Sequence, residues 1–316
     1  MKKIMAIIIC VLVLAAIPTY GRVSKEYIRW ANGVFEIPVE IQEANDISDL
    51  QLFLDDKDEF TRMAAVRRLG EVEGSRAVSL LREIFTNEPP TRGLDIMPLV
   101  RLEVIRTLGR VGGDDAKSSL LLLLNSYWEA GPQVKDKKYF YHDRDFEPVV
   151  SLILEELYNW NNDDNVFQAA KKIAFSEATI NYYAHRIANK AWVLYLKGYM
   201  AKQGVNSGKN SAKYLLDFIE DLSEGGVAYG KLEAVKKDAA QSLFKKHGEE
   251  VLYSLQKDIE EEFEKAPRDP NGALSKGHNR LRRQISYIKK VLKEKADKRK
   301  TVKETKKQKA KKNVDN

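Results

Sequence analysis

The chain has 316 residues, of which 43% are hydrophobic and 31% are charged, with a net charge of +7 and a single cysteine. The apolar share excludes a wholly disordered chain and the charged share excludes a polytopic membrane protein, while one cysteine excludes a disulfide framework or a cysteine-based zinc site. The 18 glycines and 9 prolines are few for a β-sandwich or barrel, and the length suits two ordinary domains or one extended array.

The N-terminus has the pattern of a signal peptide. Two lysines precede an apolar run, residues 4–17, which ends at Pro18 and is followed by Gly21 at the presumed cleavage site. The run is shorter than the roughly 20 apolar residues that a transmembrane helix needs. We therefore expect a protein exported by a bacterium, periplasmic or secreted, with residues 1–21 as a signal peptide cleaved near Gly21; an uncleaved anchor is the alternative.

A repeat with a period of 39 residues follows. Residues 62–81 read RMAAVRRLGEVEGSRAVSLL and residues 101–120 read RLEVIRTLGRVGGDDAKSSL, with nine identities in twenty positions. Apolar residues at helical spacing give each copy one apolar stripe, and Gly70 and Gly74 lie near its end, where a small residue permits a turn or a close approach. The polar turn at residues 55–58 supplies an N-cap. Because neither helix can bury its stripe alone, we expect the units to stack.

The stretch LFLDDKDEFTRMAAVRRLGEV resembles a HEAT repeat, in particular the HEAT-like type also found in phycobilisome lyases. The match covers residues 47 to about 130, and amphipathic periodicity extends the array through residues 148–174, 178–202 and 210–247. The resemblance implies an all-α fold, an α-solenoid of about four to five stacked antiparallel helix pairs, with partner binding along the concave face. The expected divisions are a lead-in at 22–44, the array at 45–265, a C-terminal helix at 266–293 and a basic flexible tail at 294–316.

Equivalent positions mark the two clear copies of the repeat. For the equivalent arginines, Arg62 and Arg101, we favour charge-assisted hydrogen bonds to turn carboxylates such as Asp56 and Asp58. Such bonds would hold the turns; ligand contact is the alternative. The structural repeat positions are Arg62, Leu69, Gly70, Arg101, Leu108 and Gly109.

Signatures of catalysis are missing from the sequence. None of the four histidines has another three or four residues away, and no nucleophile elbow is present. The glycines of residues 109–113 follow an expected helix and lack a P-loop lysine, so we interpret this segment as an inter-helix turn. We therefore predict no catalytic residue, no cofactor and no metal.

Two segments could contact a partner. Residues 131–146 mix cations with aromatics, and they either form a binding patch or fold back over an edge of the array, which we favour. Residues 182–186 could line a groove, although packing is the preferred interpretation there, as it is for Trp128, Trp160 and Trp192. The possible partner-binding residues are Lys137, Lys138, Tyr139, Phe140, Tyr141, Tyr183, His185 and Arg186.

The C-terminal segment is strongly basic. Residues 280–316 hold 16 Lys and Arg against four acids, and residues 22–279 carry a net charge of −7. The apolar stripe ends near residue 292, after which we expect a solvated helix that frays into disorder. Such a tail either binds anionic polymers through counterion release or only keeps the chain soluble. The possible anion-binding residues are Lys298, Arg299, Lys300, Lys306, Lys307, Lys311 and Lys312.

These observations lead to three functional hypotheses. The first is an exported, non-catalytic helical-repeat scaffold that mediates protein–protein interaction in the bacterial envelope, with a protein partner that the sequence does not identify. The second is a binder of anionic polymer or lipid headgroups through the basic tail. The third is a HEAT-like lyase-type enzyme. We do not expect a specific nucleic-acid partner.

Overall fold

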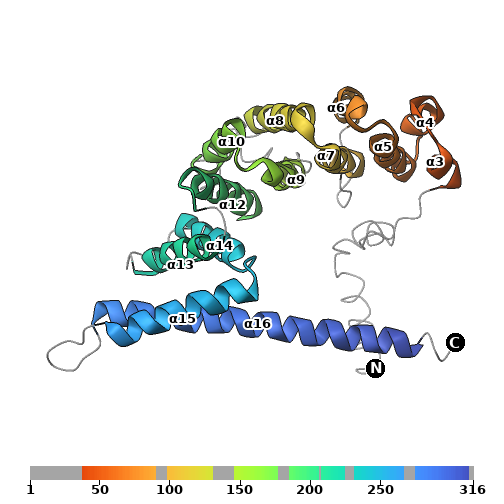
Figure 1. Ribbon diagram of the computed structural model, residues 1–316. Coiled ribbons are helices and arrows are strands. Elements are labelled where there is room, and N and C mark those ends of the chain that lie inside the picture. The colour runs from red at the N-terminus through yellow and green to blue at the C-terminus, as the bar shows by residue number, and fades with distance from the viewer. Residues whose placement is uncertain are drawn as a thin grey trace, which may run out of the picture. The chain divides into compact units, whose positions relative to one another are not determined.

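The computed structural model describes residues 38–89, 98–130, 146–176, 185–205, 208–224, 231–266 and 275–312. Every regular element in these ranges is a helix, so the predicted all-α class is confirmed (Figure 1). The chain divides into two compact units, residues 1–156 and 157–316. This boundary lies inside the single array that the sequence predicts for residues 45–265. The predicted signal peptide lies outside the described residues.

The first unit is built of two rows of helices. Helices α5, α7 and α9 pack against one another in succession and form what we call the inner row, while α4, α6 and α8 each lie against one of them (Figure 1). The short α3 packs against α4 and α5. The bounds are α3 (Val39–Glu43), α4 (Ile47–Leu54), α5 (Glu59–Glu73), η1 (Gly74–Ala77), α6 (Val78–Asn87), α7 (Leu99–Val111), α8 (Gly113–Ala130) and α9 (Phe146–Glu156).

Local side-chain chemistry explains where these helices begin and end. The Asp58 side chain accepts hydrogen bonds from the backbone N and the hydroxyl of Thr61, at 2.8 and 2.7 Å, so the N-cap predicted in the polar turn is confirmed. Gly74 and Gly112 end α5 and α7 with φ of 54° and 70°, a backbone conformation that glycine adopts without steric cost. The segment interpreted as a turn is therefore reduced to Gly112, because residues 109–111 complete α7 and Gly113 begins α8.

The repeated glycines lie where consecutive inner helices approach. A Cβ atom on Gly70 would lie 2.1 Å from Cγ2 of Thr107 in α7, and one on Gly109 would lie 2.0 Å from Oε2 of Glu156 in α9. Both glycines are inside their helices rather than in a turn. The 39-residue offset thus repeats a packing contact, with each glycine giving room to the next helix of the inner row.

The second unit is also built of paired helices. Helix α12 packs against α10 and α14, α13 packs against α14 and α15, and α15 lies alongside α16 (Figure 1). Trp192 is buried, with 3% of its surface exposed, as the packing interpretation predicts. Trp128 in the first unit is also buried, with 5% exposed. The bounds are η2 (Leu157–Trp160), α10 (Asp164–Ala174), α12 (His185–Lys202), α13 (Gly208–Glu224), α14 (Lys231–Phe244), α15 (Glu249–Lys265) and α16 (Lys276–Lys312).

Helix α16 extends through most of the predicted basic tail, residues 294–316. The predicted apolar stripe buries Leu281, Ile288, Val291 and Leu292, and beyond it, where a solvated helix is expected, the helix continues to Lys312. Its later residues are mostly Lys, Glu, Gln and Ala, which lose little conformational freedom in a helix. Across the ranges that the structure describes, no helix combines the length and the apolar character needed to cross a membrane.

Candidate functional site: a groove between α4 and α6

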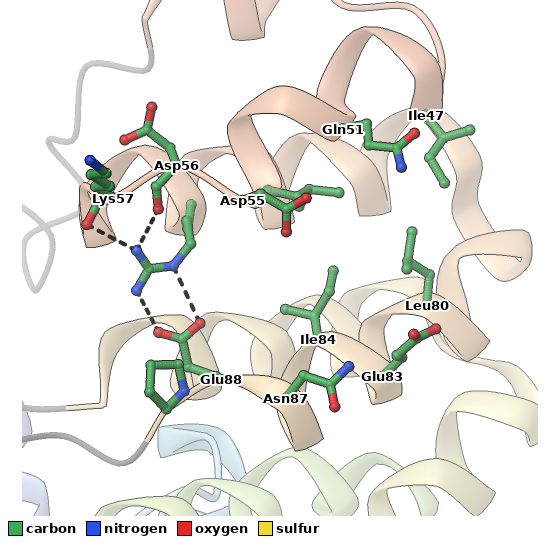
Figure 2. Close-up of a pocket in the computed structure, with 13 residues that line it drawn as sticks. Ile47, Gln51, Asp55, Asp56, Lys57, Leu80, Glu83, Ile84, Asn87 and Glu88 are labelled. Atoms are coloured by element: carbon green, nitrogen blue, oxygen red, sulfur yellow. Dashed lines mark hydrogen bonds and ion pairs between the residues drawn. The ribbon is translucent and has the colours of Figure 1, made fainter.

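A groove with a volume of about 620 Å³ runs between α4 and α6 in the first unit (Figure 2). The apolar lining that its two helices supply consists of Ile47 and Leu54 from α4 and of Leu80 and Ile84 from α6. All four side chains keep part of their surface in contact with solvent, and Ile47 is 43% exposed. The apolar residues of α4 and α6 therefore fall into two sets: the buried ones pack against the rest of the unit, and the partly exposed ones line the groove.

Arg62 closes one end of the groove. Its Nη1 donates to the carbonyl oxygens of Asp56 and Lys57, at 2.7 and 3.1 Å. Its Nη2 and Nε donate to the two carboxylate oxygens of Glu88, at 2.6 and 3.3 Å (Figure 2). Burial lowers the pKa of the Arg62 guanidinium, but the hydrogen bond and charge of Glu88 outweigh this effect and raise the pKa. The guanidinium thus connects the turn before α5 to the segment after α6.

The equivalent arginine of the next repeat has a similar role. Arg101 is 8% exposed, and its Nε donates to the carbonyl oxygen of Phe85 at 3.3 Å while its Nη2 donates to that of Glu88. In both copies the arginine binds backbone carbonyls at or just beyond the C-terminal end of the preceding helix, α4 for Arg62 and α6 for Arg101. The partners differ from the carboxylates of Asp56 and Asp58 that the sequence suggests, although a turn-holding role fits the geometry.

The charges that line the groove are mainly negative. Asp55 and Glu83 are exposed at opposite sides, one beside α4 and the other on α6 (Figure 2). Lys57 and Arg62 are the cations among the residues that line it, and Arg62 already pairs with Glu88. The groove therefore offers an apolar floor between acidic edges.

A buried ionic network lies in the inner row, away from the groove lining. The Glu103 side chain is fully buried and receives hydrogen bonds from Nε and Nη2 of Arg67, at 2.9 and 3.3 Å, and from Nη2 of Arg110 at 2.7 Å. Burial raises the pKa of the Glu103 carboxyl, but the two arginines outweigh it and hold the pKa below its usual value of 4.5. This carboxylate is therefore charged at neutral pH and connects α5 to α7.

The network continues toward α9. Burial, reinforced by the neighbouring Glu155, raises the pKa of Glu156 above 4.5, although the charges of Arg106 and Arg110 oppose the shift. Burial also lowers the pKa of Arg106. The burial of Glu103 is therefore compensated by Arg67 and Arg110, whereas for Glu156 and Arg106 the burial effect prevails, and the network is a structural arrangement rather than an exposed binding surface.

The structure describes only part of the predicted binding residues. Arg186, a partner-binding candidate, is exposed on α12, whereas Leu69 and Leu108, which were predicted as structural positions of the repeat, are fully buried. His185 begins α12, but its side chain lies outside the described residues. The remaining partner-binding candidates lie outside them as well: Lys137, Lys138, Tyr139, Phe140, Tyr141 and Tyr183.

The basic tail candidates lie on α16. Lys298 and Lys300 are exposed, and Arg299 pairs with Glu249 of α15 at 3.0 Å. The backbones of Lys306, Lys307, Lys311 and Lys312 are helical, and their side chains lie outside the described residues. Further toward the N-terminal end of α16, Arg280 and Arg283 pair with carboxylates of α13, so this part of the basic segment helps to hold the second unit together.

The groove was not foreseen from the sequence, because its apolar residues look like ordinary members of the two helical stripes. The neighbouring polar turn was the one available signal. Within the described ranges, no group of histidine, cysteine and carboxylate side chains has the arrangement of a metal site. Comparison of the chain with models of protein families, with curated proteins and with solved structures finds no match.

Proposed function

We propose that the chain is an exported, non-catalytic helical-repeat scaffold that binds a protein partner in the bacterial envelope. The observation that carries this proposal is the α4/α6 groove, which keeps apolar side chains accessible between two helices. These helices pack against the inner row, and Arg62 connects them at one end of the groove. Export rests on the N-terminal sequence pattern.

The HEAT-like character of the proposal is supported by the repeat itself. The equivalent glycines, Gly70 and Gly109, both lie where one inner helix meets the next. The equivalent arginines, Arg62 and Arg101, both bind backbone carbonyls at the end of a preceding helix. A stack of such units is an α-solenoid, a class of fold that presents extended surfaces to partners.

The chemistry of the groove favours one kind of partner. An amphipathic helix that lies between two helices buries its apolar face against them. Here the floor would receive the apolar residues, and the edges at Asp55 and Glu83 would favour lysine or arginine on the flanks of the partner helix. We infer a basic amphipathic segment of another envelope protein.

The first prediction concerns the groove. Ile84→Lys places a charge on the apolar floor, and we expect it to weaken partner capture at least tenfold, because burying an unpaired ammonium opposes binding. The measurement is crosslinking in the native cell followed by quantification of the captured protein, and then titration of that protein against the purified chain.

Leu52 provides a matched control for this prediction. It lies on α4, is 84% exposed, and does not line the groove. Leu52→Lys therefore adds the same charge nearby and should leave capture within about twofold of the unsubstituted chain. If both variants lose partner capture equally, or if Ile84→Lys leaves capture unchanged, the groove is not the binding site.

The structure also favours a second candidate function, the binding of anionic polymer or lipid headgroups through α16. The supporting observation is that residues 296–305 are exposed along a continuous helix, with Lys298, Lys300 and Lys303 among them. A helix that presents several cations to solvent attracts anionic surfaces in a salt-dependent manner.

A deletion tests this second candidate. We expect a chain that ends at residue 295 to lose at least tenfold in affinity for phosphatidylglycerol vesicles, because it lacks nine of the 17 lysines and arginines of residues 276–312. The affinity of the full chain for the same vesicles should fall steeply as the salt concentration rises from about 50 to 200 mM. Vesicle sedimentation measures both effects, and truncated protein that binds as well as the full chain would contradict the candidate.

A further inference from the structure

A small pocket of about 200 Å³ lies in the second unit, where α12, the start of α13 and the end of α14 meet. Met200, Leu215 and Leu243 give it an apolar lining. Lys246, which is exposed in the turn after α14, also lines the pocket, so the pocket reaches the surface of the protein. Ligand sites usually have volumes of about 300–1,000 Å³, so this pocket has room for a small group only.

A hydroxyl and an imidazole form a pair at this pocket. Oγ of Ser211, the fourth residue of α13, lies 3.0 Å from Nε2 of His247, in the turn before α15. Nδ1 of the same ring lies 3.1 Å from the carbonyl oxygen of Phe244. Since a carbonyl oxygen only accepts, Nδ1 carries the hydrogen, and Nε2 of the neutral ring accepts from the Ser211 hydroxyl. The other acceptor beside Oγ is Sδ of Met200 at 4.0 Å, and a thioether accepts only weakly.

The surroundings of His247 favour the neutral ring. Burial lowers its pKa below the ordinary value of 6.5, and the charges of neighbouring lysines lower it further, against opposing backbone hydrogen bonds. At neutral pH the ring can therefore take up a proton at Nε2, which is what a general base for the serine must do. The charged and titratable groups near the ring come from η2, α12, the turn after α14 and α16: Tyr158, Lys197, Lys246 and Lys295.

The start of α13 adds a place for negative charge beside Ser211. Gly208 begins the helix and lines the pocket. The first N–H groups of a helix have no acceptor within it, and helical side chains tilt toward the N-terminal end, so the Ser211 side chain leans toward these groups. Such N–H groups stabilise a carbonyl oxygen that becomes negative when a nucleophile attacks its carbon.

We propose that Ser211 is an activated nucleophile that accepts a short acyl group from a small carboxylic ester, which makes the pocket a site of covalent modification. Oγ attacks the carbonyl carbon, an Oγ–C bond forms, and the C–O bond to the alcohol breaks. The serine proton passes to Nε2 of His247 and then to the departing alkoxide, which leaves as the neutral alcohol. The acyl group then lies against the apolar lining of the pocket. This inference goes beyond the proposed function and does not depend on the α4/α6 groove.

The test is the reaction of the full chain with p-nitrophenyl acetate. We expect a burst of p-nitrophenolate equivalent to one acetyl group per chain, and peptide mass spectrometry should place that group on Ser211. Ser211→Ala should abolish the burst, and His247→Gln should slow it about a hundredfold, the usual contribution of a general base. Ser242→Ala is the matched control: it removes an exposed hydroxyl of α14 that does not line the pocket, and the burst should stay within about twofold.

Two further readouts distinguish an activated serine from a hydrogen bond that only supports the fold. The burst should slow as pH falls through the pKa of His247, below 6.5, because a protonated ring cannot take the serine proton. p-Nitrophenyl octanoate should react about tenfold more slowly, since its acyl chain is too large for the pocket.

Three results would overturn the proposal. They are the absence of a burst, acetyl groups on lysines instead of Ser211, and a burst rate that His247→Gln leaves unchanged in a variant that circular dichroism shows to be folded. The mapped site and the pH profile come from the unsubstituted chain, so they decide the question even where a variant fails to fold.

Discussion

Arg67→Met is expected to lower the free energy of unfolding of the first unit by about 3 kcal/mol at neutral pH. The reason is that Glu103, whose side chain is fully buried, loses its two hydrogen bonds to Arg67 and keeps a charge that burial disfavours. Urea unfolding followed by circular dichroism measures the effect. The unfolding curve is fitted with a separate transition for each of the two units.

The pH dependence of the same variant has a defined sign. In the unsubstituted chain the folded-state pKa of Glu103 is below 4.5, so its contribution is complete above pH 4.5 and is lost as pH falls through the lower folded-state value. Without Arg67 the burial effect prevails, the carboxyl protonates at higher pH, and the deficit of the variant shrinks on acidification. A deficit that is constant from neutral pH to pH 4 would contradict this explanation.

Two further variants isolate the buried pair. Arg76→Met removes an arginine whose side chain is 77% exposed and should change stability by less than about 0.5 kcal/mol. Combining Arg67→Met with Glu103→Met removes both charges and should recover part of the loss, since the cost comes from the unpaired carboxylate. A double variant that is less stable than Arg67→Met would place the effect in packing instead.

Gly70→Ala is expected to destabilise the first unit by about 2 kcal/mol, even though alanine is the better helix former by about 1 kcal/mol. The added Cβ would lie 2.1 Å from Cγ2 of Thr107, a residue that is 1% exposed. Thr107 cannot yield cheaply, because its Oγ1 accepts a hydrogen bond from Arg110 at 2.7 Å. Thermal unfolding of the unsubstituted protein and of the Gly70→Ala variant measures the difference in stability.

Gly109→Ala is the matched comparison at the equivalent repeat position. Its Cβ would approach the carboxylate end of Glu156, which can swing aside more readily than a threonine Cβ branch. We therefore expect a change of less than about 1 kcal/mol, because helix propensity offsets the remaining contact. A loss at Gly109 as large as that at Gly70 would show that the chemistry of the opposing side chain does not decide the cost.

The all-helical class was predictable because apolar spacing and N-cap chemistry are local. The stripe through Met63, Val66 and Leu69 and the cap at Asp58 needed no knowledge of distant residues. Other features depend on contacts far apart in the sequence. The inside position of Gly70 in α5 and the division of the chain after Glu156 follow from which helices meet, and the continuation of α16 depends on small propensities summed over many residues.

The candidate sites were less predictable for the same reason. Ile47 and Ile84 are 37 positions apart, and nothing in either stripe shows that their helices leave a groove between them. Ser211 and His247 are 36 positions apart, and each is unremarkable alone. Arg62 was singled out by the repeat, but its backbone acceptors could not be chosen over the nearby carboxylates until the turn geometry was known.

The unbroken course of α16 sets a length scale for the second unit. Among the residues of α16 whose side chains the structure describes, Leu292 is the last that is buried, and Lys312 lies twenty residues beyond it. At about 1.5 Å per residue, this stretch spans roughly 30 Å. It would therefore act as a stiff spacer rather than a slack tether. A surface bound at the far end of the helix would be held at a nearly fixed distance from Leu292, and a closer approach would require the helix to tilt or unwind.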